Sequence, residues 1–252
     1  MTRRISADGT TRRPDDVIVE EPMEIRLDDT VVATTMRTPG HDYELAVGFC
    51  LTEGLLVGAM IAEVRYCATG SAVETAFNVV SVDTGRTAAV PRPRLGNTSS
   101  SCGLCGSEAI ETLTERLEPL DRADFDLALV GTIAAQVEAS QELFSKTGGV
   151  HAAAAFHLAD GEVLMIREDI GRHNAVDKVV GRLLLDERLP ASGLGLWISG
   201  RASFEMVQKA WAAGFALLVS VSAGSALAAD TARAAHITLV GFARDGAAVI
   251  YE

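Results

Sequence analysis

The chain has 252 residues, of which 48% are hydrophobic and 22% charged, a composition typical of a folded globular protein. Lysine and arginine total 22 against 34 for aspartate and glutamate, and the net charge of −12 argues against diffuse attraction to nucleic acid or an anionic membrane. No run approaches the roughly 20 apolar residues of a membrane span. We therefore expect neither nucleic acid nor a membrane as a partner. An anionic ligand would need a local pocket.

Cysteine usage bears on the cellular compartment. The four cysteines, at positions 50, 67, 102 and 105, are too few and too irregularly spaced for the disulfide framework of a secreted protein. The first residues carry charge but lack the apolar core of a signal peptide. We therefore expect a cytoplasmic protein whose residues 1–16 form a flexible N-terminal tail.

The first third of the chain predicts a smaller α+β part over residues 17–95. Residues 23–37, MEIRLDDTVVATTMR, alternate around Asp28 and Asp29, which indicates a β-hairpin. Apolar residues at helical spacing predict a helix over residues 41–56. Residues 62–69 and 76–83 then predict two further strands.

The segment that follows, PRPRLGNTSSSCGLCG, has no periodicity and is rich in proline, glycine and serine. This composition predicts a loop. We expect residues 96–106 to be a mobile Cys-x-x-Cys loop, and a helix to begin in SEAIETLTERLE.

The second half of the chain predicts a layered sheet. Continuous apolar strands alternate with amphipathic helices, which indicates an α/β sheet that is at least partly parallel, and we assign this core to residues 107–252. Strands are predicted at 151–158, 162–169, 194–199, 215–222, 237–243 and 247–252, and helices at 173–187, 202–214 and 225–236.

Three turns, REDIGRHN, SGRAS and SAGSA, lie where a predicted strand is followed by a helix. In open α/β sheets, ligands bind at the carboxyl ends of the strands. Each turn offers glycine or free backbone amides at a helix start, and the first two add Arg172 and Arg201, which could contact phosphate. Any one of these turns alone would more often be a helix cap, and His173 could equally be a structural histidine. Their combination predicts a nucleotide site.

The pair Cys102 and Cys105 has Cys-x-x-Cys spacing, which allows several chemistries. A structural zinc needs four ligands, and we expect none, because Cys50 and Cys67 are predicted to be buried in a helix and a strand. A thioredoxin-like pair is the commoner interpretation, but the usual aromatic residue and preceding strand are missing. A zinc deaminase would need an upstream His-x-Glu motif, which is absent.

Nucleophilic sulfur chemistry remains for this pair. Both cysteines lie beside a predicted helix start, where the helix dipole and free amides lower a thiol pKa and favour the thiolate. A thiolate can accept sulfur as a persulfide. Gly103 and Gly106 give the loop freedom, and the second thiol could assist release by forming a disulfide.

Six longer motifs occur in order between residues 38 and 246. They are TPGHDYELAVGF, SSCGLCG, TGGVHAAA, REDIGRHNAVDKVVG, SGRASFEMVQKAWAAG and ITLVGFARDG. Together they resemble the motifs of the FdhD family of formate dehydrogenase accessory sulfurtransferases, over nearly the whole chain.

The resemblance implies a sulfur carrier that accepts persulfide sulfur from a cysteine desulfurase. It passes the sulfur to the molybdenum bis(molybdopterin guanine dinucleotide) cofactor, which formate dehydrogenase requires. The resemblance also implies a homodimer and an α/β fold, namely a cytidine-deaminase-like three-layer sheet without the zinc.

The resemblance places the persulfide on Cys102, with Cys105 assisting. It places the family's cofactor-binding segment on Phe242, Ala243, Arg244, Asp245, Gly246 and Ala247. From the residues themselves, the strand-end turns add Arg172, His173, Ser199, Gly200, Arg201 and Ser222 as contacts for phosphate and nucleotide. One departure from the family is Gly224, which stands where the family usually has proline and which loosens the third turn.

Two other functions remain compatible with the sequence. One is a chaperone that binds the molybdenum cofactor without persulfide chemistry. The other is a dithiol oxidoreductase, for which a stable bridge between Cys102 and Cys105 is expected.

Overall fold

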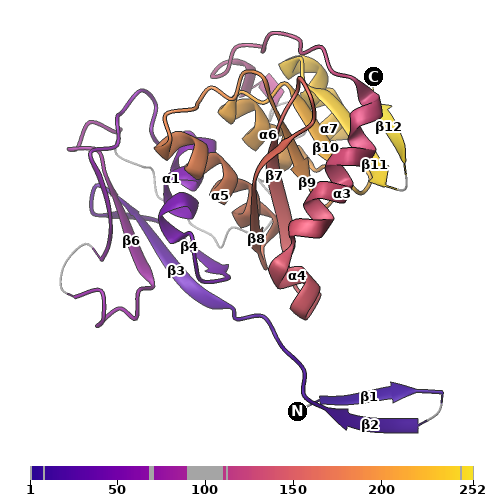
Figure 1. Cartoon of the computed structure of the whole chain (residues 1–252). Helices are drawn as coiled ribbons and strands as arrows, with labels where there is room; N and C mark the ends of the chain where they lie inside the picture. Colours follow the sequence, from indigo (N-terminus) through magenta and orange to yellow (C-terminus); the bar gives the residue numbers. More distant parts are fainter. Residues whose placement is uncertain are drawn as a thin grey trace.

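The computed structural model describes residues 2–7, 9–67, 71–89, 110–111, 113–244 and 246–251. Its largest element is a six-stranded mixed sheet with the strand order β12-β11-β10-β9-β7-β8 (Figure 1). Strands β9, β10 and β11 are parallel, and β7 runs antiparallel to β8 and β9. Strands β8 to β11 therefore finish at one end of the sheet, called here the carboxyl end. The strands are β7 (His151–His157), β8 (Val163–Asp169), β9 (Leu194–Ile198), β10 (Leu217–Ser220), β11 (Thr238–Arg244) and β12 (Ala247–Tyr251).

Helices cover both faces of this sheet. Alternate residues of β7 serve two hydrophobic cores: Ala153 and Ala155 pack with the helices of one face, Ala152 and Ala154 with those of the other. The first face carries α5 (Arg172–Leu185), α6 (Phe204–Ala213) and α7 (Ala226–Ala235), and the second carries α3 (Val130–Ser140). The predicted three-layer α/β class is therefore confirmed.

The N-terminal part is a four-stranded sheet with one helix. The strand order is β4-β3-β6-β5, and the β3–β4 turn holds Asp28 and Asp29 at positive φ, as a tight hairpin requires. Met23, Ile25 and Val80 pack against the helix in a core of their own. The predicted hairpin, helix and two strands are all present. Their bounds are β3 (Glu21–Leu27), β4 (Thr30–Arg37), α1 (Asp42–Thr52), β5 (Glu63–Tyr66) and β6 (Val79–Asp83).

Helix α1 joins the N-terminal part to the larger sheet by packing closely on α5 (Figure 1). Two glycines allow this approach. A Cβ atom on Gly48 would lie 1.9 Å from the carbonyl oxygen of Asp177, and one on Gly181 would lie 1.8 Å from that of Glu44. Because only glycine leaves room for the facing backbone, the helix crossing depends on these two positions.

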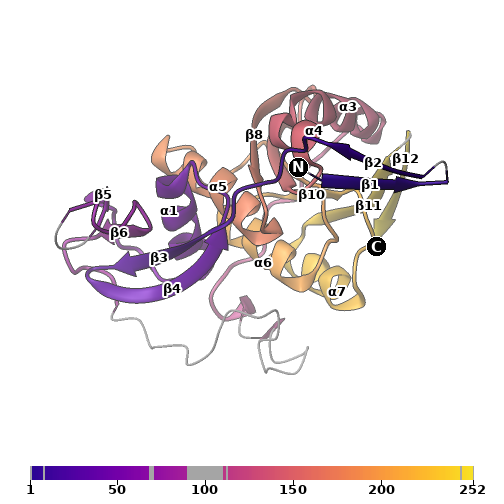
Figure 2. The ribbon, with the colours of Figure 1, turned by 90° about the horizontal axis from the view of Figure 1, so that it is seen from below.

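Residues 2–13 form an antiparallel hairpin of β1 (Thr2–Ser6) and β2 (Gly9–Arg13) that stands below the body in Figure 1 and overlaps the larger sheet when seen from below in Figure 2. The sequence predicts a flexible tail here, and the structure adds regular pairing to it. Its flexibility stays a prediction.

The patterning predicts no element between residues 119 and 150, where the structure has α3, the short helix α4 (Glu142–Thr147) and the 3-10 turn η1 (Leu127–Leu129). The predicted loop 96–106 lies outside the described residues. The helix predicted after it is seen at residues 110–111 and 113–114. The predicted division between residues 17–95 and 107–252 stays a prediction.

Candidate functional site

Four turns meet at the carboxyl end of the sheet, namely the REDIGRHN, SGRAS and SAGSA turns and the turn that follows β11. The Ser220 hydroxyl donates to the carbonyl of Gly200 at 2.7 Å, which ties the SGRAS turn to β10. The N–H of Phe242 donates to the carbonyl of Ser222 at 3.1 Å, which places the end of β11 beside the SAGSA turn. A methyl group added at Gly200 would contact Arg172 of the REDIGRHN turn. The convergence expected from strand-end position is therefore present.

The structure gives the predicted site residues different exposures. Arg172 is half-buried at the start of α5, whereas Arg201 and Arg244 are exposed. Ala243 faces the core, so only its backbone can meet a ligand. Asp245, Cys102 and Cys105 lie outside the described residues. The others brought to the carboxyl end are His173, Ser199, Gly200, Ser222, Phe242, Gly246 and Ala247.

His151, the first residue of β7, lies beside Ser199 at this end. Its Nδ1 is 3.2 Å from the Ser199 hydroxyl, and that hydroxyl accepts the N–H of Ala152 at 2.9 Å. Burial, Arg172 and His173 lower the pKa of His151. The lowered pKa favours the neutral imidazole, which has one ring nitrogen as a donor and the other as an acceptor at this end of the sheet.

His173, in the first turn of α5, contacts Glu205, in the first turn of α6. Nε2 of His173 lies 3.3 Å from Oε2 of Glu205, and the Ser203 hydroxyl donates to the same oxygen at 3.1 Å. The hydrogen bond from His173 lowers the pKa of Glu205. The contact joins the starts of α5 and α6 through side chains.

The N-termini of α5, α6 and α7 all open onto this end of the sheet. Gly171 and Ser203 precede α5 and α6 without a side-chain cap, whereas the Ser225 hydroxyl caps α7 by accepting the N–H of Ala228 at 3.1 Å. Uncapped amides at a helix N-terminus are donors suited to phosphate or carboxylate oxygens. The N-terminal backbone amides of α5 and α6 are therefore more available to a ligand than those of α7.

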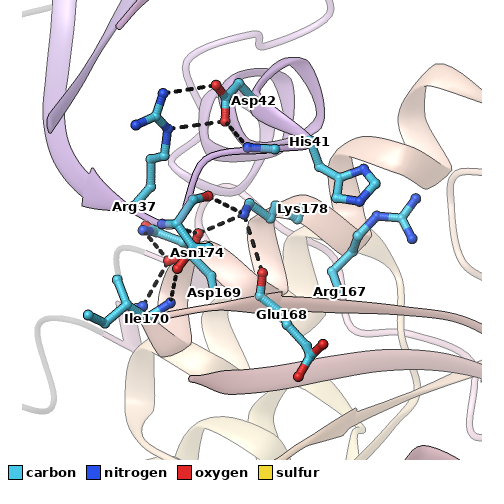
Figure 3. Close-up of polar contacts among 12 residues, drawn as sticks. Arg37, His41, Asp42, Arg167, Glu168, Asp169, Ile170, Asn174 and Lys178 are labelled. Carbon is cyan, nitrogen blue, oxygen red and sulfur yellow. Dashed lines mark hydrogen bonds and ion pairs between the residues drawn. The ribbon is translucent and has the colours of Figure 1, made fainter. Parts of the chain in front are cut away.

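A buried carboxylate holds the first turn in place (Figure 3). Asp169 accepts from the N–H groups of Thr38 and Gly171 at 3.1 and 2.8 Å, and from the Asn174 amide at 2.9 Å. Its Oδ2 also pairs with Nζ of Lys178 at 2.7 Å. Four partners satisfy this carboxylate, so the turn that presents Arg172 has one strongly preferred shape.

The N-terminal part supplies one of these partners and adds two further bonds. The Thr38 hydroxyl accepts the N–H of Ile170 at 3.1 Å, and its carbonyl accepts Lys178 Nζ at 2.9 Å. Arg37, which precedes Thr38, is almost fully buried and donates to both oxygens of Asp42 at 3.1 and 3.0 Å (Figure 3). The loop from β4 to α1 is thus fixed at both ends and braces the first turn.

Of the two cysteines that the structure describes, Cys50 is a poor candidate for the sulfur chemistry. Cys50 is fully buried in α1, as predicted, and burial together with Asp177 and Asp28 raises the pKa of its thiol to about 12. The prediction for Cys67 was wrong: it follows β5 and is half-buried at positive φ. Among the residues with a described placement, no three His, Cys, Asp or Glu side chains gather as metal ligands.

Some residues of the site lie inside the quoted motifs without an individual signal of their role. The strands predicted at 151–158 and 162–169 are consecutive, and pairing them as a hairpin places His151 opposite Asp169, which is the register that the structure has. From the sequence alone, Glu205 is expected to be an ordinary acidic residue in the first turn of a helix. Lys178 is expected to be an exposed lysine on a helix. Only the packing of α5 on α1 reveals that Lys178 is buried.

A cavity of about 1340 Å³ lies elsewhere, lined by the segment after α1, the C-terminal end of α5 and residues 113–117. Val57, Leu113 and Leu184 are among its apolar lining residues. None of the predicted site residues that the structure places lines this cavity. The carboxyl end of the sheet therefore remains the candidate site.

Comparisons with known proteins bear on this arrangement. The model of the FdhD/NarQ family matches residues 18–252. The chain is 44% identical over 258 residues to the sulfur carrier protein FdhD of Mycolicibacterium paratuberculosis, covering 98% of this chain and 93% of that protein. The chain belongs to the FdhD/NarQ family. A second member, the sulfur carrier protein FdhD of Corynebacterium efficiens, is 45% identical over 244 residues, 92% of this chain and 87% of that protein.

A solved structure resembles the whole chain. It is the crystal structure of a protein from Desulfotalea psychrophila proposed to be a formate dehydrogenase accessory protein, with a TM-score of 0.76 and 24% identity. The alignment covers 100% of this chain and 94% of that one. At this identity the likeness supports the fold. Within the described part of this FdhD/NarQ chain, no helix is long and apolar enough to cross a membrane.

Proposed function

We propose that the protein is a sulfur carrier that accepts persulfide sulfur on Cys102 from a cysteine desulfurase. It then passes the sulfur to the molybdenum bis(molybdopterin guanine dinucleotide) cofactor used by formate dehydrogenase. The observation that carries the proposal is the meeting of four turns, two uncapped helix N-termini and three arginines at the carboxyl end of the sheet. Relatives named sulfur carrier protein FdhD support the sulfur chemistry.

The cofactor is the sulfur acceptor, and its phosphates fit this end of the sheet. The chain carries a net charge of −12, so a polyanion must be held by local donors rather than by the overall field. Arg172, Arg201 and Arg244 can each contact phosphate oxygens with a planar fork of donors. Backbone amides of α5 and α6 add donors that carry no mobile side chain.

The sulfur steps balance with the desulfurase persulfide, the two cysteines and a thiol reductant. The Cys102 thiolate attacks the outer sulfur of the desulfurase persulfide, so that the donor's S–S bond breaks and its thiolate leaves. The Cys105 thiol then attacks Sγ of Cys102, which forms a disulfide and releases the carried sulfur as sulfide to the molybdenum centre. A cellular thiol reductant must afterwards reduce the disulfide.

Intact-protein mass spectrometry tests the sulfur step. The protein is incubated with a cysteine desulfurase and cysteine, and wild type is compared with Cys102→Ala, Cys105→Ala and the control Cys50→Ala. We expect a gain of roughly 32 Da that reduction removes, present in the control and absent in Cys102→Ala.

The alternatives give different outcomes. No gain in wild type, with a desulfurase active on another acceptor, would favour a cofactor-binding chaperone. A stable Cys102–Cys105 bridge with turnover of disulfide substrates would favour a dithiol oxidoreductase. Cytoplasmic location and a homodimer stay predictions, which fractionation and light scattering can check.

A further inference from the structure

Glu205 places a carboxylate in a site otherwise suited to anions. It lies in the first turn of α6, its side chain is 22% exposed, and its neighbours include His173 and the Arg172 turn. A carboxylate repels phosphate, so at this position it opposes phosphate binding unless it faces a part of the ligand that donates hydrogen bonds.

The contacts of Glu205 fix one carboxylate oxygen and leave the other open. Oε2 accepts from the Ser203 hydroxyl at 3.1 Å and lies 3.3 Å from Nε2 of His173. Because an ionised carboxylate only accepts, Nε2 of His173 must carry a proton. No group within the described part of the chain donates to Oε1. The hydrogen bond from His173 also lowers the pKa of Glu205, so the carboxylate is ionised at neutral pH.

Guanine is the part of the proposed ligand with matching donors. Its Watson–Crick edge presents the N1–H and the exocyclic N2 amine, which suit an acceptor that cannot donate. Adenine presents an unprotonated N1 at the same place. Hypoxanthine keeps the N1–H but lacks the amine, so the three bases form a graded series of donors.

We propose that Glu205 is a specificity-determining residue that recognises the guanine base by accepting from its N1–H and N2 amine at Oε1. The inference rests on the proposed function, because it takes the guanine dinucleotide cofactor as ligand. His173 and Ser203 then act as positioning residues that hold the carboxylate. The phosphates lie toward the arginines, away from the carboxylate.

Nucleotide titration by calorimetry tests the proposal with GDP, IDP and ADP as probes. We expect wild type to bind GDP about tenfold more tightly than IDP, and ADP more weakly still, because each lost base contact costs on the order of one tenfold step. Glu205→Ala should remove both base contacts, so that the affinity falls about 100-fold for GDP and about tenfold for IDP while ADP binding stays within a few fold, and the three nucleotides then bind alike. Glu205→Gln keeps the shape but exchanges an acceptor for a donor, and serves if the alanine variant does not fold.

Glu138→Ala, which removes an exposed glutamate from α3 on the other face of the sheet, is the matched control and should keep the preference for GDP. A wild-type ratio of GDP to IDP affinity retained in both Glu205 variants would overturn the assignment. So would an equal loss for all three nucleotides, because that result means that Glu205 acts on a part of the ligand that they share rather than on the base. If wild type binds none of the nucleotides, the proposed cofactor site fails as well.

Discussion

The ammonium nitrogen of Lys178 lies 2.7 Å from Oδ2 of Asp169, and the two side chains are 1% and 0% exposed. Removing one member of such a pair leaves an uncompensated buried charge, which costs about 3–5 kcal/mol. We expect Lys178→Met to lower the free energy of unfolding by this amount in urea denaturation. Arg182→Met, on the same helix but exposed, should change it by less than about 1 kcal/mol. Equal effects would mean that the buried pair does not hold the turn.

The crossing of α1 and α5 gives a second prediction. A Cβ atom at Gly181 would lie 1.8 Å from a backbone oxygen of Glu44, so the helices must separate in Gly181→Ala. Overpacking of this kind costs about 1–3 kcal/mol or more. Gly131→Ala in α3, whose nearest neighbour would be 3.8 Å away, should be neutral or slightly stabilising. Thermal unfolding of both variants checks the contrast, and a harmless Gly181→Ala would contradict the close packing.

Much of this fold can be predicted from the sequence, because the hydrophobic pattern of each segment indicates its own secondary structure. The Asp28 and Asp29 turn and the apolar strands β9 and β10 follow from periods of two and from continuous apolar runs. Helix α3 is not predicted, because VGTIAAQVEAS mixes β-branched residues and glycine with a weak apolar stripe. Its identity as a helix depends on the sheet face that it covers.

Some residues of the candidate site can likewise be predicted from local sequence, and others cannot. Arg172 and Arg201 follow from the rule that ligands bind where strands end, which uses chain order alone. Glu205 and Thr38 could not be predicted, because their roles come from contacts across 32 residues to His173 and across 131 residues to Asp169. A single sequence does not show which residues far apart in the chain are in contact.

Glu44 predicts how stability responds to acid. Burial opposes its ionisation, but hydrogen bonds and charge from Arg167 and His41 lower its pKa from 4.5 to about 2. A lowered carboxylate pKa stabilises the fold above pH 4.5, and this contribution is lost as the pH falls from about 4.5 toward 2. In urea denaturation, the stability difference between wild type and Glu44→Gln should therefore be largest at pH 7 and shrink at pH 3.

Glu187→Gln, at an exposed carboxylate, is the control for this experiment. Its difference from wild type should stay small at both pH values. A Glu44→Gln difference that does not change between pH 7 and pH 3 would show that the carboxylate titrates alike in the folded and unfolded chains.

The arginines at the carboxyl end of the sheet should dominate phosphate binding. Arg201 is exposed beside the N-terminus of α6, so its removal takes away a charged donor without leaving a buried cavity. A hydrogen bond to a charged group contributes about 1.5–3 kcal/mol, so Arg201→Gln should weaken GDP binding roughly 10- to 100-fold. Arg201→Lys should recover only part of this loss, because an ammonium lacks the planar fork of donors.

Arg188→Gln removes an equally exposed arginine just beyond the far end of α5 and should leave GDP binding within twofold of wild type. Repeating the titrations at higher salt separates contact from diffuse attraction, because exposed charges more than about 10 Å apart are screened at 0.1 M salt. A direct contact keeps Arg201→Gln weaker than wild type at every salt concentration. If wild type and Arg201→Gln bind GDP equally well at high salt, Arg201 acts through long-range electrostatic attraction rather than contact. The phosphates are then held by backbone amides and the other arginines.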